Sequence, residues 1–364
     1  MRYAASELHQ LCRRVLDALD VPAWEAEITA DVLRYADLRG IDSHGVTLLP
    51  WYVGSLRKGA YAAQREISVV HESPSTALID GGNGLGGPTA VRAMQIAIEK
   101  GKRVGSACVA VRHSSHFGAA GYYAAMALEH DLIGLCLTNA GPAVLPTFGL
   151  QPQCGTNPIA LAVPAGKEPA FVLDMATSVK AAGKLKVLAR AGLPVPDGWF
   201  VEGDGRMGRD PQYFVKRRSS TMLGGMLPLG GADEETSGYK GFGLGLGVEM
   251  LTGVLAGDIA SPFMKLLPGY PEPSVSHFFA AMRIDAFRPA EEFKAEVDRL
   301  LAHIKASPRM PGHERIFVAG EKETECMRER QARGVPLPDA LVRELHGLAE
   351  EVGVPAPVPA WPSP

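Results

Sequence analysis

The chain has 364 residues, enough for one large hydrophobic core or two ordinary ones, and its 46% hydrophobic and 21% charged residues are typical of a globular protein. Lysines and arginines number 37 against 40 aspartates and glutamates, so the net charge of −3 offers no basic surface and no nucleic-acid partner is expected. The five scattered cysteines and the absence of an apolar signal core indicate thiols in a reducing, cytoplasmic compartment, not disulfides or a zinc site.

Amphipathic helices open the chain. Residues 1–20 have leucines and valines at helical spacing, and Pro22 begins a second helix that runs to about residue 40. That helix ends in Asp42-Ser43-His44-Gly45, where an imidazole stands beside a hydroxyl and a carboxylate, before a glycine that permits a sharp turn. Imidazole is the side chain best suited to proton transfer near neutral pH, so His44 is a candidate acid or base.

Strands and helices alternate from about residue 76 to 290, which predicts an α/β core. A short helix at 51–56 precedes it, and the turn-rich residues 192–212 predict a long surface excursion. The predicted core elements are strands at 77–80, 104–111, 133–138, 159–163, 170–174 and 276–284, and helices at 88–102 and 119–130.

The segment Gly82-Asn-Gly84-Leu-Gly86-Gly87 matches a dinucleotide-binding fingerprint between a predicted strand and a predicted helix. The next strand ends at Val111-Arg112 and not at an acidic residue, so a dinucleotide here would need a phosphorylated ribose. The alternative is a glycine-rich turn that only permits a tight strand-to-helix connection.

Residues 241–257 are almost uncharged, but Glu249 interrupts the run, which is too short to span a bilayer. Its alternate glycines indicate a backbone packed against another element, so a buried core helix is predicted and no membrane association. Further helices are predicted at 290–305 and 337–352, before a proline-rich extended tail at 355–364.

Four more polar islands follow His44, at 112–118, 155–158, 174–178 and 238–241, and together they indicate one polar pocket. His113 and His116 stand three apart, but a third ligand at matching spacing is missing, so no metal site is predicted. His116 begins a predicted helix, whose backbone N–H groups suit a phosphate. The alternative for His116 is a capping histidine in a surface loop.

Asp174 lies at the carboxyl end of a predicted strand, where a carboxylate can bind a ribose hydroxyl or cap the following helix. Lys184 is an isolated positive charge soon after that helix begins. Lys240 lies in a glycine-flanked turn, where a mobile ammonium could reach a phosphate or a substrate oxygen.

With these residues assembled, the chain resembles the type-2 malate/L-lactate dehydrogenase family. That family also includes ureidoglycolate, sulfolactate and diketogulonate dehydrogenases and reductases of cyclic ketimine carboxylates. Seven ordered motifs, which extend to about residue 330, carry the resemblance: 37–45, 113–117, 137–139, 155–158, 174–178, 238–241 and 311–312.

The resemblance implies an α/β fold with a mixed, non-Rossmann sheet of the L-sulfolactate dehydrogenase-like type, which binds NAD or NADP. It also implies a homodimer with active sites near the subunit contact. Residues 1–75 with 290–364 would form a mainly helical N- and C-terminal part, and 76–289 the cofactor- and substrate-binding core. The glycine fingerprint then reduces to a turn.

By the same resemblance, His44 would donate the proton to a developing alkoxide or amine, with Ser43 bonded nearby and Lys184 as a third catalytic residue. Some descriptions of the family give the acid/base role to the position of His116, and the sequence leaves this open. Thr156 would approach the substrate. The expected cofactor-binding residues are His116, Phe117, Gly118, Ala119, Ala120, Asn139, Asp174, Met175, Ala176, Lys240, Gly312 and Glu314.

Leu48 departs from the family pattern, because many members have there an arginine that clamps the substrate carboxylate. Either another cation (Arg39, Lys184 or Lys240) replaces it, or the substrate is not a plain 2-oxo acid. Lys184 favours a carbonyl or alcohol substrate, because members that reduce cyclic imines tend to have an acidic residue there.

The predicted function is hydride transfer between NAD(P) and a malate- or lactate-like 2-oxo or 2-hydroxy acid. The alternatives are a reductase of a cyclic ketimine carboxylate (pyrroline- or piperideine-2-carboxylate) and a nucleotide-binding relative without catalysis. His277, near the start of a late strand, is interpreted as a core histidine in preference to a residue of the pocket wall.

Overall fold

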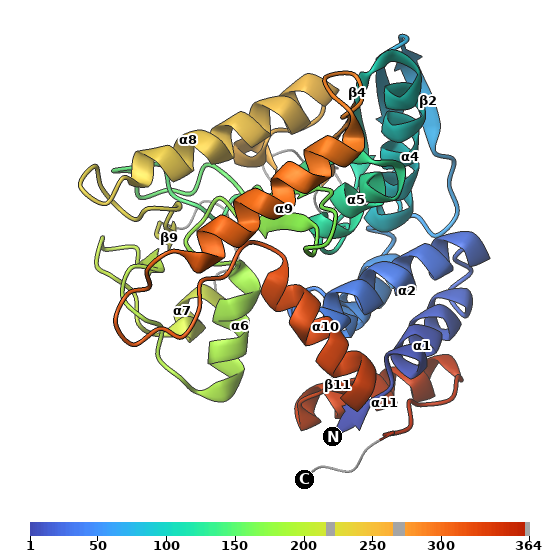
Figure 1. The fold of residues 1–364 in the computed structure, drawn as a ribbon. Coiled ribbons are helices and arrows are strands. Elements are labelled where there is room, and N and C mark those ends of the chain that lie inside the picture. Colours follow the sequence, from blue (N-terminus) through green and yellow to red (C-terminus); the bar gives the residue numbers. More distant parts are fainter. Residues whose placement is uncertain (216–222, 265–273, 361–364) are drawn as a thin grey trace.

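The computed structural model describes residues 1–215, 223–264 and 274–360, and a seven-stranded mixed sheet lies at its centre (Figure 1). In this sheet only β3 and β4 pair in parallel, and every other neighbouring pair is antiparallel. This arrangement confirms the predicted non-Rossmann fold, because a doubly wound sheet is mostly parallel. In order across the sheet the strands are β2 (Ser68–Glu72), β3 (Thr76–Asp80), β4 (Ser106–Ser114), β10 (Val275–Arg283), β5 (Leu132–Thr138), β6 (Ile159–Val163) and β7 (Phe171–Met175).

Two helices cover the sheet where the chain alternates between strand and helix. The helix α4 (Gly86–Val104) packs on β4 and β10, and α5 (Ala120–Met126) packs on β5 and β6. Small and apolar side chains on α4, such as Ala90, Met94 and Ala97, are buried against Val109 and Phe279 of the sheet. The helix predicted at 119–130 ends earlier, because residues 127–130 tighten into a 3₁₀ turn.

The chain ends meet in a helical cluster. Here α1 (Ala5–Asp17), α2 (Ala23–Leu38), α3 (Leu49–Arg57) and α11 (Asp339–Val352) share one apolar core, and β1 (Arg2–Tyr3) pairs with β11 (Val335–Pro336). The N–H of Ala360 donates to the carbonyl of Arg2 at 3.1 Å, and both ends lie on the same side of the molecule (Figure 1). The predicted division into two parts stays a prediction.

The region between β7 and β10 packs around a small core that it shares with Val144 and Cys154. It contains α6 (Ala182–Ala191), the two-stranded pair β8 (Phe200–Val201) and β9 (Gly225–Met226), and α7 (Pro211–Val215). The excursion predicted at 192–212 is therefore not all surface, since Phe200 is buried in a small core with Leu185 and Met226.

The prediction of a buried helix over 241–257 is wrong for one face. The helix α8 (Gly238–Glu249) continues as a π-helical turn over Met250–Val254, and Leu244, Met250 and Val254 are exposed. Several segments were not predicted, among them the strand β2, whose residues are all exposed, and the helix α10 (Glu321–Arg333). In the part of the chain that the structure describes, no helix has the length and apolar character to cross a membrane. The five cysteines are free, and the cytoplasmic location stays a prediction.

Candidate active site

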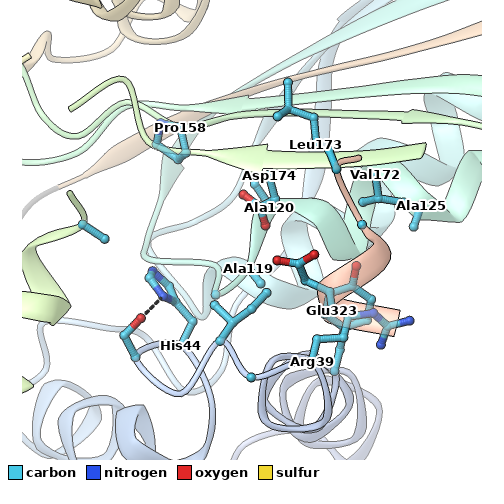
Figure 2. Close-up of a pocket in the computed structure, with 18 of the residues that line it drawn as sticks. Arg39, His44, Ala119, Ala120, Ala125, Pro158, Val172, Leu173, Asp174 and Glu323 are labelled. Atoms are coloured by element: carbon cyan, nitrogen blue, oxygen red, sulfur yellow. Dashed lines mark hydrogen bonds between the residues drawn. The ribbon is translucent and has the colours of Figure 1, made fainter. Parts of the chain in front are cut away.

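A cavity of about 540 Å³ lies between the helical cluster and the edge of the sheet (Figure 2). Its walls come from the end of α2 and the following turn, the start of α5, the strand β7, the start of α6 and the start of α10. The polar side chains that line it are Tyr35, Arg39, Asp42, Ser43, His44, Thr156, Asp174, Lys184, Glu323 and Thr324.

His44 lies on the cavity wall with its Nδ1 2.9 Å from the Oγ of Ser43 (Figure 2). Burial lowers the pKa of His44 to about 4, so the imidazole is neutral at pH 7 and can accept a proton. The turn that holds it depends on Asp37, whose Oδ2 accepts the N–H of Val46 at 2.9 Å. A Cβ on Gly45 would lie 1.7 Å from Asp37 Oδ1, so this turn requires glycine.

His116 lies behind His44 and does not line the large cavity. The two imidazole rings are stacked with centroids 5.4 Å apart, and the Nδ1 of His116 is 2.9 Å from the hydroxyl of the buried Tyr52. This placement favours His44 over His116 as the group that meets a ligand in the cavity. His116 also precedes α5 by four residues, so it does not begin that helix.

His113 turns away from His116, and its Nδ1 binds Asp80 at 2.8 Å, so the two histidines do not converge on a metal. Within the described ranges, the one group of residues with metal-ligand spacing is His9, Glu27 and Asp31. Arginine side chains already neutralise both of its carboxylates, and none of its members lines the cavity.

Asp174, near the end of β7, exposes its carboxylate to the cavity. Its Oδ2 accepts the N–H of Gly121 at 2.7 Å, and desolvation by the surrounding protein raises the pKa of Asp174 to about 6. Gly118, Ala119 and Ala120 line the same cavity, and Ala120 lies next to Asp174 (Figure 2). Gly118 has φ +84°, and a Cβ there would lie 2.5 Å from Cγ1 of Val32, so the close approach requires glycine.

Two cations line the cavity at different places. The guanidinium of Arg39 stacks on the ring of Tyr35 at 3.7 Å, near Glu323 and away from His44 (Figure 2). Lys184 belongs to α6, whose Gly183 packs against Ser43 so closely that a Cβ on Gly183 would lie 2.7 Å from the Ser43 Cβ. The start of α6 therefore lies beside the Ser43–His44 pair, and Lys184 lines the same cavity.

Several residues expected in the site lie outside the cavity wall. Leu48 packs against the apolar core of the helical cluster, and Phe117 stacks on His277 at 4.4 Å in the interior. Asn139 is buried, and Met175 lies at the end of β7. Exposed positions outside that wall hold Lys240, Gly312 and Glu314.

The glycine-rich turn at 82–87 encloses a side chain and not a phosphate. The guanidinium of Arg65 donates to the carbonyls of Gly81 and Leu85 and pairs with the buried Glu25 at 3.0 Å. A Cβ on Gly84 would lie 1.9 Å from Nε of Arg65. Because the turn presents carbonyl oxygens to a cation, it repels a phosphate, and the interpretation as a plain turn holds.

Two buried polar residues organise the region behind the cavity. His277 lies between the hydroxyls of Ser114 and Thr138, at 2.8 and 2.7 Å, and is fully buried, which confirms the predicted core histidine. Glu249 accepts hydrogen bonds from Asn139 and Asn157, at 2.9 Å each. Sequence reasoning missed this role of Glu249, although a lone carboxylate in an uncharged helix is the signal that could have found it.

The chain is similar over its whole length to a known group of enzymes. The family model described as malate/L-lactate dehydrogenase matches residues 3–346. A malate dehydrogenase of Pyrococcus abyssi is 42% identical over 354 residues, which cover 97% of this chain and 96% of that protein. An L-sulfolactate dehydrogenase of Methanothermobacter thermautotrophicus is 35% identical over 358 residues, which cover 97% of this chain and 98% of that one.

Solved structures agree with this result. The crystal structure of malate dehydrogenase from Entamoeba histolytica matches with a TM-score of 0.95 at 32% sequence identity, over 98% of this chain and 99% of that one.

Proposed function

Because the chain belongs to the malate/L-lactate dehydrogenase family and is thus an NAD(P)-dependent oxidoreductase, we propose that it acts on a small 2-oxo or 2-hydroxy acid with a second anionic group. The observation that carries the proposal is the Ser43–His44 pair on the wall of a cavity that Asp174 and Lys184 also line. The two relatives described above act on malate and on sulfolactate, which are 2-hydroxy acids with a carboxylate or a sulfonate at the far carbon.

The residues of the cavity suit a nicotinamide dinucleotide. Asp174 Oδ2 is occupied by the Gly121 N–H, and the rest of this carboxylate faces the cavity, where it can accept hydrogen bonds from ribose hydroxyls. Gly118 lets the chain pack against Val32, and its backbone lines the cavity with Ala119 and Ala120, where the cofactor would lie. When bound, the nicotinamide supplies or accepts the hydride.

His44 handles the proton in this proposal. In oxidation the neutral imidazole takes the proton of the substrate hydroxyl and becomes the imidazolium, and reduction is the reverse of this step, after the imidazole has taken up a proton from water. Ser43 fixes the ring through Nδ1, which leaves Nε2 for the substrate. A positioned acid/base of this kind contributes about 10²–10⁴-fold to the rate.

Lys184 replaces the missing arginine as the anchor of the substrate carboxylate. Leu48 cannot serve, because it is apolar and packs on the helical cluster away from the cavity. Lys184 lines the cavity on the helix whose Gly183 packs against Ser43, and its ammonium is the cation to which we assign the substrate carboxylate. Thr156, also on the wall, offers a hydroxyl to the same substrate.

The test is a set of initial rates of NADH and NADPH oxidation with oxaloacetate, sulfopyruvate, pyruvate and a cyclic ketimine carboxylate. We expect oxaloacetate or sulfopyruvate to be turned over at least about tenfold faster than pyruvate, because a second anion adds a charged hydrogen bond. Fastest turnover of the ketimine would move the chain to the reductase branch. Binding of the cofactor without any turnover would point to a relative that has lost catalysis.

We also propose that two copies associate through an apolar surface on α8. This surface, called the α8 face, comprises Tyr239, Leu244, Leu246, Met250, Leu251, Val254, Leu255 and Phe263, which are all exposed. A contiguous apolar helix face of this kind on a globular protein marks a protein–protein contact. A second copy of the chain is the proposed occupant, and the sedimentation coefficient at micromolar concentration tests it.

A further inference from the structure

Glu249, the last residue of α8, is a buried carboxylate with only neutral partners. Its Oε1 accepts from Nδ2 of Asn139 at 2.9 Å and from the N–H of Ser261 at 2.8 Å. Its Oε2 accepts from Nδ2 of Asn157 at 2.9 Å and lies 2.5 Å from the Oγ of Ser261, whose single proton is shared between Oε2 and the carbonyl of Ala140 at 2.7 Å. The residue is 3% exposed, and across 1–215, 223–264 and 274–360 no lysine or arginine forms an ion pair with it.

Three N–H donors explain why a carboxylate is needed at this position. A glutamine would present an N–H₂ group to at least one of them, whereas a carboxylate accepts from both asparagines and from the N–H of Ser261 and donates none. Burial of an unpaired charge is costly unless hydrogen bonds replace its water. The buried charge of Glu249 therefore costs free energy of folding, and its hydrogen bonds identify the residues that it holds in place.

Asn157 carries the effect of Glu249 to the cavity. It has φ +34° and is fully buried, and its Nδ2 also donates to the carbonyl of Gly245 at 2.9 Å. Its own carbonyl accepts from Oγ1 of Thr177 at 3.1 Å. The carbonyl of Thr156 accepts the N–H of Thr177 at 2.9 Å. The residues 156–157 are thus held between α8 on one side and the end of β7 on the other.

The backbone of α8 is shaped for this contact. A Cβ on Gly245 would lie 3.0 Å from Oγ1 of Thr177, and one on Gly253 would lie 3.0 Å from Nδ2 of Asn139. The π-helical turn begins at Met250, directly after Glu249. Such turns insert one extra residue into a helix and are frequent beside functional sites.

We propose that Glu249 is a positioning residue: it holds Asn157 in its left-handed conformation and thereby places the hydroxyl of Thr156 against the substrate. The inference rests on the proposed function, since it takes the cavity to hold a 2-oxo acid. Asp174, which we assign to the cofactor, accepts a hydrogen bond from the N–H of Gly121 and none from this network. Glu249 is therefore expected to affect the binding of the acid and not the binding of the cofactor.

The first experiment compares Glu249→Gln with Thr252→Val. Thr252 is fully buried in the same turn, but its hydroxyl bonds only to helix carbonyls, so this variant matches the structural disturbance. We expect both variants to lose thermal stability. We expect only Glu249→Gln to raise the KM for the 2-oxo acid, by about five- to tenfold for one misplaced hydrogen bond, with the Kd for NADH changed less than twofold. An unchanged KM, or an equal rise in Thr252→Val, would overturn the proposal.

A double-variant cycle tests the route through Thr156. Thr156→Val removes the hydroxyl but keeps the backbone carbonyl that Thr177 binds. If Glu249 acts through that hydroxyl, the effect of Glu249→Gln on KM disappears in the Thr156→Val background. Additive effects on KM would show a general structural role and overturn the proposal.

Amide hydrogen exchange separates this inference from the proposed function. If the unaltered protein turns over no oxo acid, the proposed function fails, but exchange of the Thr177 amide can still be compared. Faster exchange in Glu249→Gln than in Thr252→Val would support the positioning of residues 156–157 by Glu249, and equal exchange would overturn it.

Discussion

At the scale of single residues, the stacked pair of His44 and His116 decides which imidazole carries the proton. Only His44 lines the cavity, while His116 is bonded to the buried Tyr52. We expect His44→Asn to lower kcat by about 10²–10⁴-fold, since it removes the acid/base, and to leave the Kd for NADH unchanged. Steady-state rates and nicotinamide fluorescence measure the two quantities.

His116→Asn is the matched control for this prediction. It removes the second imidazole but leaves the Ser43–His44 pair intact. We expect a fall in kcat of less than about tenfold, the effect of one altered hydrogen bond behind the site. A larger loss in His116→Asn than in His44→Asn would assign the proton transfer to His116.

His277 makes a prediction about pH and stability. Burial lowers its pKa in the folded chain to about 3, against about 6.5 for an exposed imidazole. Between these values the unfolded chain binds more protons, so the stability that the neutral imidazole gives is complete above pH 6.5 and is lost as the pH falls toward 3. We expect the protein to lose about 2 kcal/mol more than His277→Gln between pH 7 and pH 5.

Urea unfolding at the two pH values measures this difference. Glutamine retains a donor and an acceptor for Ser114 and Thr138 but does not titrate. Parallel losses in both proteins would show that His277 does not contribute to the acid sensitivity.

Local sequence signals predicted which residues line the cavity more reliably than they predicted which residues contact one another. The Asp42–Gly45 turn and Asp174 were singled out from residue type and position, and Lys184 from the resemblance to the family, and all of them line the cavity except Gly45. The roles of Arg65 and Glu249 were missed, because their partners lie far away in the sequence. Arg65 is joined to residues 81–89, and Glu249 to residues 139 and 157.

At the scale of elements, the two sides of α8 make different contacts. Its inner side accepts a hydrogen bond from Asn157, and its outer side exposes the residues of the α8 face. If two copies associate there, a charge in the α8 face opposes association, because it must be desolvated. We expect Val254→Asp combined with Leu255→Asp to convert the dimer to a monomer, as measured by sedimentation velocity.

Phe287→Asp serves as the control, since Phe287 is 77% exposed but lies outside α8. We expect this variant to sediment like the unaltered protein. A monomer in all three proteins would remove the α8 face as a contact between copies, and a dimer in all three would place the contact elsewhere.

Two of the elements that the sequence did not predict, α10 and β2, lack an apolar pattern. The helix α10 is largely polar and charged, and Arg330 is its one buried residue, so no apolar period reveals it. The strand β2 is exposed at the edge of the sheet and has no buried face. The prediction of a buried helix at 241–257 failed for the opposite reason. Its residues are apolar, but an apolar run does not distinguish a helix in the core from one at a contact surface.

At the scale of the whole molecule, β10 joins two parts of the sheet that lie far apart in the chain. It forms hydrogen-bond ladders with β4 on one side and β5 on the other. Ala280, opposite Cys108 and Leu135, is at its middle. Since proline removes a ladder hydrogen bond in a central strand, we expect Ala280→Pro to abolish cooperative unfolding and soluble expression.

Val70→Pro is the comparison variant, because Val70 lies at a register shift in the exposed edge strand β2. We expect it to fold and to unfold cooperatively, as seen by circular dichroism on heating. Equal damage in both variants would contradict the central role of β10.

Because the two chain ends lie next to each other, the same fold can be built from a chain in which the elements follow one another in a different order. The N–H of Ala360 reaches the carbonyl of Arg2, so a linker of a few residues can close the chain into a ring. The ring can be opened at the exposed turn around Gly205, which lies outside the central sheet and the cavity wall. In such a rearranged gene, β10, α10 and α11 would be translated before Asp42–His44, and the same sheet and cavity would still form.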